Sequence, residues 1–474
     1  MRVRPALLVL AALLATGCAA QPGNGDAIGV DLIVAGDHVV TMDGDQPVLT
    51  DGAVAVDDGY IVAVGAREEI GRRYRARETL DGKDRVVLPG LINGHAHSAM
   101  TLMRGIADDR ELMDWLRNYI FPTEVRFVDP EFVRIGTELA CWEMIRGGTT
   151  TFVDMYYFPD AVAEAVEGCG LRVLVAPTVI DQKSPDAADA ANSLRLAAEF
   201  VGRWKGRNNR IIPILGAHSV YTMKPPQLAA VRAKAQELGV PVSVHLSESR
   251  YEIDYSRQTY STTPIDLLEN LGFFDGPTIG AHVIYPTDEE IPILARRKVG
   301  VIHNPTSNMK ISSGVAPVAK MLDAGVAVGL GTDGAATNND LDLWEEMRLA
   351  AFLQKVSTMD PKVVPARTAL KMATSGGAEA IGLADQIGTL AVGRRADLIH
   401  VSLEDLHFTP LYDLISHLVF VADEQDVVSV VVDGKVLMRE GEVVTVDVAR
   451  LRAEASELAE RIRASVVDKD AAAD

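Results

Sequence analysis

Eight short apolar segments alternate with amphipathic ones through the middle of the chain, and this alternation constrains the fold more than any other feature. The apolar segments are residues 86–97, 149–155, 172–180, 211–220, 241–247, 277–284, 299–305 and 326–334. Amphipathic stretches such as 226–239 and 288–298 separate most of them. Eight strand–helix units over roughly 290 residues are typical of a TIM barrel. We therefore expect an α/β protein built on a (β/α)8 barrel.

Strand-rich pieces flank this middle region on both sides. Residues 31–87 contain short β patterns with turns, and a matching pattern returns at 388–402, 427–438 and 441–447. Such an arrangement favours one small β-sandwich domain assembled from both chain ends. The predicted domains are 30–88 plus 386–446 for the composite β domain, 89–385 for the barrel, and 447–474 for a C-terminal helix and tail.

The first 29 residues have the pattern of an export signal followed by a flexible tether. Arg2 and Arg4 precede an apolar run at 6–15, and the stretch LLATGC ends at Cys18. A basic start, a short apolar run and small residues are typical of a secretory signal. Small residues directly before a cysteine resemble a bacterial lipoprotein signal. We expect an exported periplasmic or cell-surface lipoprotein anchored at Cys18; the alternative is a plain signal peptide in which Cys18 is incidental.

Charge and cysteine content limit the partners. The net charge of −20 disfavours nucleic acid, whose binding needs clustered Lys and Arg. Three cysteines are too few and too scattered for a disulfide framework or a cysteine-based zinc site. We expect a small-molecule substrate, membrane contact through the lipid anchor only, and either a monomer or a homo-oligomer.

Ionisable side chains gather at the ends of the predicted barrel strands. Six of the ten histidines lie there, and Glu248 and Asp333 accompany them. The histidines are His95, His97, His218, His245, His282 and His303. Because the active site of a TIM barrel lies at the carboxyl ends of its strands, these side chains should converge on one mouth.

Part of this set has the composition of a metal site. His95 and His97 are two residues apart, which places both on one face of an extended strand. With His245 and Asp333 they would bind one divalent metal and leave a position for water. The metal lowers the pKa of that water to about 7, so that hydroxide is available at neutral pH. We expect Zn²⁺, with Fe²⁺ or Mn²⁺ as alternatives.

Glu248 and His282 are the candidates for proton transfer. Hydroxide attack on an amidine carbon requires a proton for a ring nitrogen and another for the leaving amine, and a carboxylate and an imidazole can supply them. The alternatives are a solvated loop carboxylate for Glu248 and a further metal ligand for His282. We interpret His303 as a structural histidine at a strand end.

Longer motifs carry a family resemblance. INGHAH at 92–97, VHLSE at 244–248, HNPTSNMKISSG at 303–314 and the segment from GTDGAATNND to AAFLQK at 331–355 resemble the amidohydrolase superfamily. More closely, they are similar to the 5-methylthioadenosine/S-adenosylhomocysteine deaminase group, and the similarity runs from about residue 32 to residue 444.

The resemblance implies roles for individual residues. It implies His95, His97, His245 and Asp333 as metal ligands, Glu248 and His282 as proton-transfer residues, and Asp333 as a base toward the hydroxide. It also implies substrate contacts by Glu248, by His218 beside the nucleoside and by Glu124 on the ribose hydroxyls; the alternative for Glu124 is an ordinary carboxylate at a helix start. Binuclear relatives need a carboxylated lysine at the end of the fourth strand. His218 stands there and Lys224 lies six residues beyond, so we expect one metal.

One departure from the family pattern concerns the substrate. Members often carry an arginine after the third strand that faces the amino-acid end of S-adenosylhomocysteine, and this chain has Ala176 and Pro177 there. We therefore expect a preference for a small or apolar 5′ group, unless Arg172 or an arginine of a neighbouring loop replaces it.

The leading hypothesis is a deaminase of an adenosine-type nucleoside such as 5-methylthioadenosine, acting by attack of a metal-bound hydroxide. A second is a related exported hydrolase of a free purine or pterin base or an s-triazine. A third is a lipid-anchored binding protein without catalysis, which the full set of ionisable residues argues against.

Overall fold

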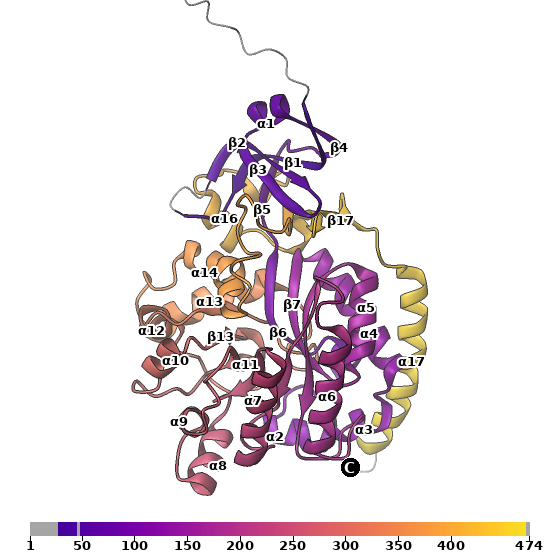
Figure 1. Ribbon diagram of the computed structural model, residues 1–474, viewed down its shortest axis with the longest axis vertical. Coiled ribbons are helices and arrows are strands. Elements are labelled where there is room, and N and C mark those ends of the chain that lie inside the picture. Colours follow the sequence, from indigo (N-terminus) through magenta and orange to yellow (C-terminus); the bar gives the residue numbers. More distant parts are fainter. Residues whose placement is uncertain (1–26, 45–47, 471–474) are drawn as a thin grey trace, which may run out of the picture.

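The computed structural model describes residues 27–44 and 48–470 (Figure 1). Its larger sheet is a closed parallel barrel, in which the fourth strand position is split into β9 and β10 and β10 also pairs with β8. The strands are β6 (Leu91–Ala96), β7 (Thr149–Tyr156), β8 (Arg172–Val179), β9 (Ile211–Pro213), β10 (Leu215–Ala217), β11 (Val242–Leu246), β12 (Thr278–His282), β13 (Gly300–His303) and β14 (Val328–Leu330). The expected (β/α)8 barrel is confirmed.

Helices surround the barrel (Figure 1). They are α4 (Pro130–Arg146), α5 (Pro159–Cys169), α6 (Ala190–Trp204), α7 (Pro225–Leu238), α8 (Arg250–Tyr260), α9 (Pro264–Asn270), α10 (Ile291–Arg297), α11 (Pro305–Lys310), α12 (Val318–Asp323), α13 (Leu343–Thr358), α14 (Ala366–Ala373) and α15 (Ser375–Ala380). Between β6 and α4 the chain forms a 3-10 helix (Ser98–Met103), α2 (Leu112–Asp114), a π-helical segment (Trp115–Ile120) and α3 (Phe121–Phe127).

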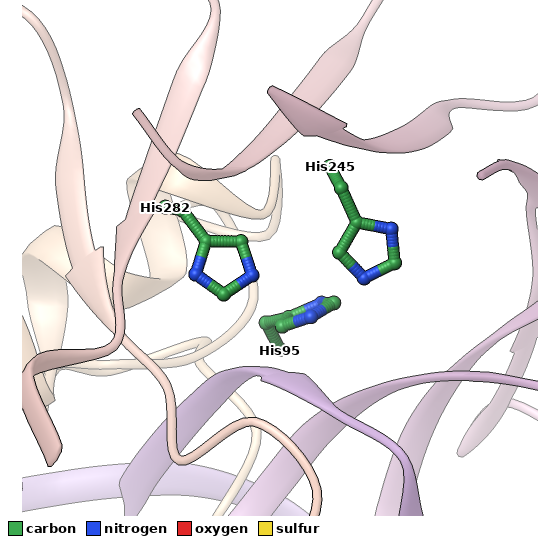
Figure 2. Close-up of side chains that lie close together, drawn as sticks. All are labelled: His95, His245 and His282. Atoms are coloured by element: carbon green, nitrogen blue, oxygen red, sulfur yellow. The ribbon is translucent and has the colours of Figure 1, made fainter. Parts of the chain in front are cut away.

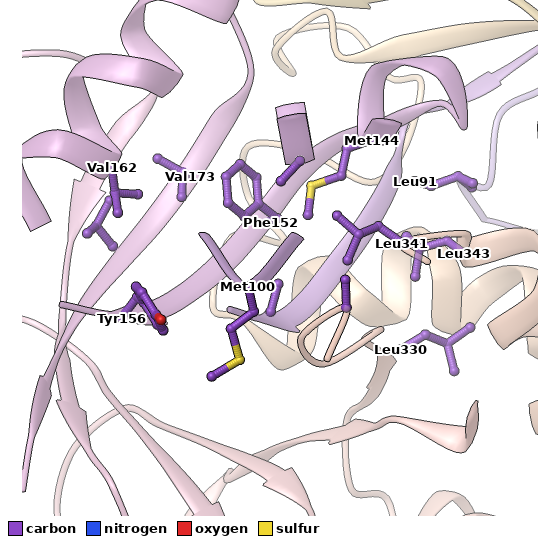
Figure 3. Packing of buried hydrophobic residues seen from close by; sticks show 14 of the residues in the cluster. Leu91, Met100, Met144, Phe152, Tyr156, Val162, Val173, Leu330, Leu341 and Leu343 are labelled. Carbon is purple, nitrogen blue, oxygen red and sulfur yellow. The ribbon is translucent and has the colours of Figure 1, made fainter. Parts of the chain in front are cut away.

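Two layers of buried apolar side chains stabilise the barrel. Inside it, Ile92, Val153, Leu174 and Ile302 belong to one buried cluster. Outside it, residues such as Phe152 and Val173 belong to a larger cluster that also includes side chains of the surrounding helices, for example Met144 of α4 (Figure 3). Successive residues of a strand, such as Phe152 and Val153, belong to the outer and the inner cluster in turn. Because side chains alternate between the two faces and both faces are covered, both sets are apolar.

The smaller sheet joins both ends of the described chain. Its strands are β1 (Ile28–Val40), β2 (Val48–Asp57), β3 (Tyr60–Ala66), β4 (Tyr74–Leu80), β5 (Arg85–Pro89), β15 (Leu398–Ser402), β16 (Val427–Val432), β17 (Lys435–Arg439) and β18 (Glu442–Val443). Helix α1 (Arg67–Arg73) packs on β2, β3 and β4, whereas α16 (Leu414–Phe420) packs on α13 and α14. β5 pairs with β1 on one side and with β15 on the other. The small β domain built from both chain ends is thus confirmed.

The first apolar segment, expected as one strand, is two strands in two sheets. β5 belongs to the small sheet and β6 to the barrel, and Gly90 lies between them. Gly90 N–H donates to Asp397 O, and a Cβ at Gly90 would lie 2.1 Å from the Thr150 side chain. Hydrophobicity is continuous across this junction and does not divide the segment, but the turn-forming pair Pro89–Gly90 and the domain boundary predicted at 88/89 both lie beside the change of sheet.

The C-terminal helix α17 (Val448–Asp470) packs along α4. Arg134 and Arg450 form ion pairs with Glu454 and Glu138 across this contact. Among the described residues, none of the helices combines the length and apolarity needed to span a bilayer.

Candidate active site

The carboxyl ends of the barrel strands surround one cleft, as expected for this fold. Its walls include His97, Glu124, Tyr156, His218, Glu248 and Asp333, and its empty space, with its open mouth, is about 570 Å³. The residues come from five different barrel strands or the segments that follow them, and from α3. Five candidates from distant parts of the sequence, His97, Glu124, His218, Glu248 and Asp333, thus meet in one place.

Three imidazoles and one carboxylate form a compact cluster at the bottom of this cleft. Asp333 Oδ1 lies 3.1 Å from His97 Nε2 and 3.4 Å from His95 Nε2. His245 Nε2 lies 3.4 Å from His97 Nε2. Figure 2 shows the rings of His95, His245 and His282 turned toward one another. These groups are close enough to share a cation: His95 with His97 and Asp333, and His95 with His245 and His282.

Neighbouring groups hold the rings in the orientation a metal requires. His97 Nδ1–H donates to Met155 O at 2.6 Å, and His245 Nδ1–H donates to His218 O at 2.9 Å. Because the backbone oxygens can only accept, the lone pair of each ring in its neutral form lies on Nε2, toward the cluster. Ser307 Oγ and Thr337 Oγ1 donate to Asp333 Oδ2, which leaves Oδ1 facing the imidazoles.

The donor set fits a divalent metal of the zinc type. His95 is fully buried, yet neither of its ring nitrogens has a hydrogen-bond partner among the described residues. Unpaired buried nitrogens cost free energy, and a cation bound to Nε2 would remove part of that cost. Imidazole nitrogens and a carboxylate oxygen are common zinc ligands.

The charges of the cluster are arranged for cation binding. Burial lowers the pKa of His95 to about 4, so this ring is neutral at pH 7. Burial also acts to lower the pKa of His97, but the Asp333 carboxylate outweighs it and raises that pKa to about 9. A cation that binds His97 must displace this proton, so the affinity for metal should fall as the pH falls.

Glu248 and His282 lie beside the cluster. His282 Nε2 is 3.9 Å from Glu248 Oε1 and 4.0 Å from Asp333 Oδ2. On the other side of the ring, His282 Nδ1 lies 2.9 Å from Asn308 Oδ1. Burial raises the pKa of Glu248, while the charge of His282 acts against this. A carboxyl group with a raised pKa exchanges protons more readily near neutral pH, as a general acid or base must.

Glu124 faces the cleft from α3 and is 2% exposed. Tyr157 Oη donates to Glu124 Oε2 at 3.4 Å. Burial raises the pKa of Glu124 to about 7, although Tyr156, His97 and Tyr157 favour its charged form. The ionised form, which accepts hydrogen bonds from hydroxyl groups, therefore gains population as the pH rises through 7.

His218 follows β10 and also lines the cleft. Its Nδ1 lies 3.0 Å from Thr222 Oγ1 and 3.2 Å from Ser219 Oγ, and its ring centroid is 6.3 Å from that of Phe121. Burial lowers the pKa of His218 to about 3, so the ring is neutral. A neutral imidazole beside an aromatic ring can contact a ligand in the cleft by ring stacking or through a hydrogen bond.

Several backbone positions around the cluster are conformationally unusual. Ser247, His282, Val283 and Asp333 have φ angles of 50°, 74°, 46° and 63°. Positive φ is costly for side chains other than glycine, and especially for a β-branched residue such as Val283. Such positions concentrate at functional sites, where the surrounding structure holds them.

Three other candidates lie apart from the cluster. His303 is fully buried and belongs to neither group of candidate ligands. Lys224 is at the start of α7, 73% exposed at its side chain, and pairs with Asp181 at 2.9 Å. Arg172 begins β8 at the opposite end of the barrel from the cleft and forms a buried ion pair with Asp397 at 2.8 Å. Arg172 therefore cannot replace the arginine missing after the third strand.

The sequence analysis missed three tyrosines that line the cleft, Tyr156, Tyr157 and Tyr221. Tyr156 ends β7 and Tyr157 follows it, and both line the cleft. The rule that located the histidines, a polar side chain at a strand end, also applies to them.

Comparisons with known proteins agree with this geometry. A family model described as the amidohydrolase family matches residues 86–437. A 5-methylthioadenosine/S-adenosylhomocysteine deaminase from Desulforudis audaxviator is 46% identical over 416 residues, 88% of this chain and 96% of the relative. A 5′-deoxyadenosine deaminase from Methanosarcina barkeri is 42% identical over 433 residues, 91% of this chain and 98% of the relative. The crystal structure of an adenosine deaminase from Xanthomonas campestris with bound zinc matches with a TM-score of 0.90 and 37% identity, over 92% of this chain and 100% of the other.

Proposed function

Since this chain belongs to the amidohydrolase family, we propose that it is a zinc-dependent aminohydrolase that removes the amino group of an adenosine-type nucleoside such as 5-methylthioadenosine. The observation that carries this proposal is the meeting of two groups in one cleft. The His/Asp cluster lies at its bottom, and the buried Glu124 faces the same cleft. The relatives named as adenosine-type deaminases support the choice of substrate.

The positions of the site residues suggest a separate role for each of them. His95, His97, His245 and Asp333 would hold the metal, which supplies Lewis-acid activation of water near neutral pH. Glu248 would deliver a proton to the purine ring nitrogen. Asp333 and His282 would accept and pass on the proton released by the attacking water, until the amine leaves as ammonia.

Glu124 and His218 would hold the nucleoside. The Glu124 carboxylate would accept hydrogen bonds from the two ribose hydroxyls, each worth about 1.5–3 kcal/mol net because one partner is charged. The neutral His218 ring would lie against the nucleoside. The test is ammonia release from a panel of adenosine analogues, guanine-type bases and s-triazines. Deamination of a nucleoside supports the proposal, and release from a free base or triazine alone contradicts it.

The metal content is a first prediction. Four candidate ligands from three strand ends form one cluster. Lys224, the lysine nearest to the end of the fourth strand, pairs with Asp181 and is not among the described residues that line the cleft, so it would not bridge a second metal. We expect one tightly bound divalent ion per chain, with zinc as the ion retained. Elemental analysis of the purified protein checks this, and two ions per chain would contradict the mononuclear site.

The substrate range is a second prediction. None of the described residues that line the cleft is an arginine, and a distal carboxylate buried without a partner is costly. We expect kcat/KM for 5-methylthioadenosine or adenosine to exceed that for S-adenosylhomocysteine at least about tenfold, which corresponds to about 1.4 kcal/mol. The Glu124→Ala variant should lose kcat/KM with all three nucleosides. S-adenosylhomocysteine as the best substrate would overturn this argument.

The cellular address is a third prediction. LLATGC and Cys18 lie outside the described residues, so this proposal rests on the sequence alone. We propose that the mature protein begins at Cys18, carries lipid there and is held at the periplasmic or cell surface. The Cys18→Ser variant should lose detergent partitioning and remain soluble or unprocessed. Mass spectrometry that finds a mature start at another residue would exclude the anchor.

A further inference from the structure

A second carboxyl group lies directly beneath the turn that carries Glu248. Glu252, on α8, is fully buried, and its Oε2 accepts a hydrogen bond from the Glu248 N–H at 2.8 Å. Its Oε1 has no hydrogen-bond partner among the described residues. Desolvating a carboxyl group that is only half satisfied costs free energy, so its presence here needs an explanation.

An ordinary helix cap does not provide that explanation. Ser249 is the N-cap of α8, and its Oγ accepts from Glu252 N at 3.2 Å, as in a capping box. In a capping box, however, the glutamate three residues on returns to the N–H of the N-cap residue itself. Here the carboxyl group reaches one residue further, to the N–H of Glu248, and it does so in the interior of the protein.

The turn that Glu252 contacts is strained and joined to the next strand. Ser247 has a φ of 50°, and its carbonyl oxygen accepts from Ile284 N at 2.9 Å and from Tyr285 N at 3.1 Å. These two residues follow His282 at the end of β12. The turn is therefore held on one side by the segment after His282 and on the other by Glu252.

We propose that Glu252 is a positioning residue. By holding the Glu248 backbone through this hydrogen bond, it keeps the Glu248 carboxyl group facing His282, in the place from which Glu248 transfers a proton to the substrate. Glu252 is not among the described residues that line the cleft, so it would act through Glu248 rather than on the substrate. The inference rests on the proposed function only for the role of Glu248, and the contact between the two glutamates stands independently of it.

Two substitutions separate the hydrogen bond from the bulk of the side chain. Glu252→Met keeps a similar volume but removes the oxygen acceptor, whereas Glu252→Gln keeps an acceptor oxygen. Burial raises the pKa of Glu252 to about 8, so the group is mostly uncharged at neutral pH and glutamine is a close replacement. Ser249→Ala is the matched control, because it removes the helix cap and leaves the contact between Glu252 and Glu248 intact.

The experiment combines two readouts on the metal-loaded full-length protein. Amide hydrogen exchange of the segment 247–250 should accelerate in Glu252→Met and stay near wild type in Glu252→Gln. With 5-methylthioadenosine, Glu252→Met should lower kcat about 30-fold with little change in KM, since misplacing a catalytic group by about 1 Å can cost up to 100-fold. Glu252→Gln should restore kcat, and Ser249→Ala should keep it.

Each result decides the matter. Unchanged exchange in Glu252→Met, an equal loss of kcat in Ser249→Ala, or a Glu252→Gln variant as impaired as Glu252→Met would overturn the positioning role. If the wild type releases no ammonia from any nucleoside, the proposed function fails, and the exchange measurement still shows whether Glu252 holds the turn.

Discussion

Replacing Asp333 with asparagine is expected to abolish nearly all turnover while the protein stays folded. Asp333 Oδ1 lies within 3.4 Å of both His95 Nε2 and His97 Nε2, and Ser307 and Thr337 fix its other oxygen. Asparagine keeps the shape but carries no charge to balance the metal and cannot accept a proton from water. We expect kcat to fall at least about 10³-fold, within the range for loss of a proton-transfer group.

Metal analysis and circular dichroism should accompany the kinetics of Asp333→Asn. Asp342→Asn is the matched control. Asp342 lies nine residues after Asp333 and caps α13, because its carboxylate accepts a hydrogen bond from Trp344 N. It is not among the described residues that line the cleft. Because asparagine caps a helix about as well as aspartate, this variant should keep nearly wild-type stability and turnover. An Asp333→Asn variant with near wild-type kcat would remove this residue from the mechanism.

Replacing Glu248 with glutamine should separate proton transfer from metal binding. Glu248 is 5% exposed and faces His282 across 3.9 Å, but it is not one of the candidate ligands. Glutamine can still form a hydrogen bond to a purine but cannot donate a proton to its ring nitrogen. We expect kcat to fall about 10²–10⁴-fold with KM and metal content largely retained.

The control for Glu248→Gln is Glu290→Gln. Glu290 is also buried, but it accepts from Thr263 and Thr287 away from the cleft, so its loss tests stability alone. If Glu248→Gln lost metal in proportion to activity, Glu248 would act through the metal site instead.

The convergence of the histidines could be predicted from sequence because it follows from topology. Once the segments are assigned to parallel barrel strands, residues such as His95, His245 and His282 must meet at one mouth, whatever the details of packing. The family resemblance then supplied individual roles, and the match over residues 86–437 confirms the family.

Other features depend on packing that has no local sequence pattern. The apolar run before His95 is continuous, so its hydrophobicity alone does not reveal that the chain changes sheets at Gly90, close to the domain boundary predicted at 88/89. Glu124 reaches the cleft only because the segment from α2 to α3 folds over the barrel mouth. Glu252 has the spacing of an ordinary capping glutamate, and only its burial and its contact with Glu248 distinguish it.

The central claim is that a metal in the His/Asp cluster enables deamination of an adenosine-type nucleoside. The most direct measurement is ammonia release from 5-methylthioadenosine by the protein after its metal is removed with a chelator and then restored stepwise with zinc. The account predicts no release without metal and a full rate at one zinc ion per chain. Release that is independent of metal, or no release from any nucleoside while a free base or an s-triazine is hydrolysed, would contradict it.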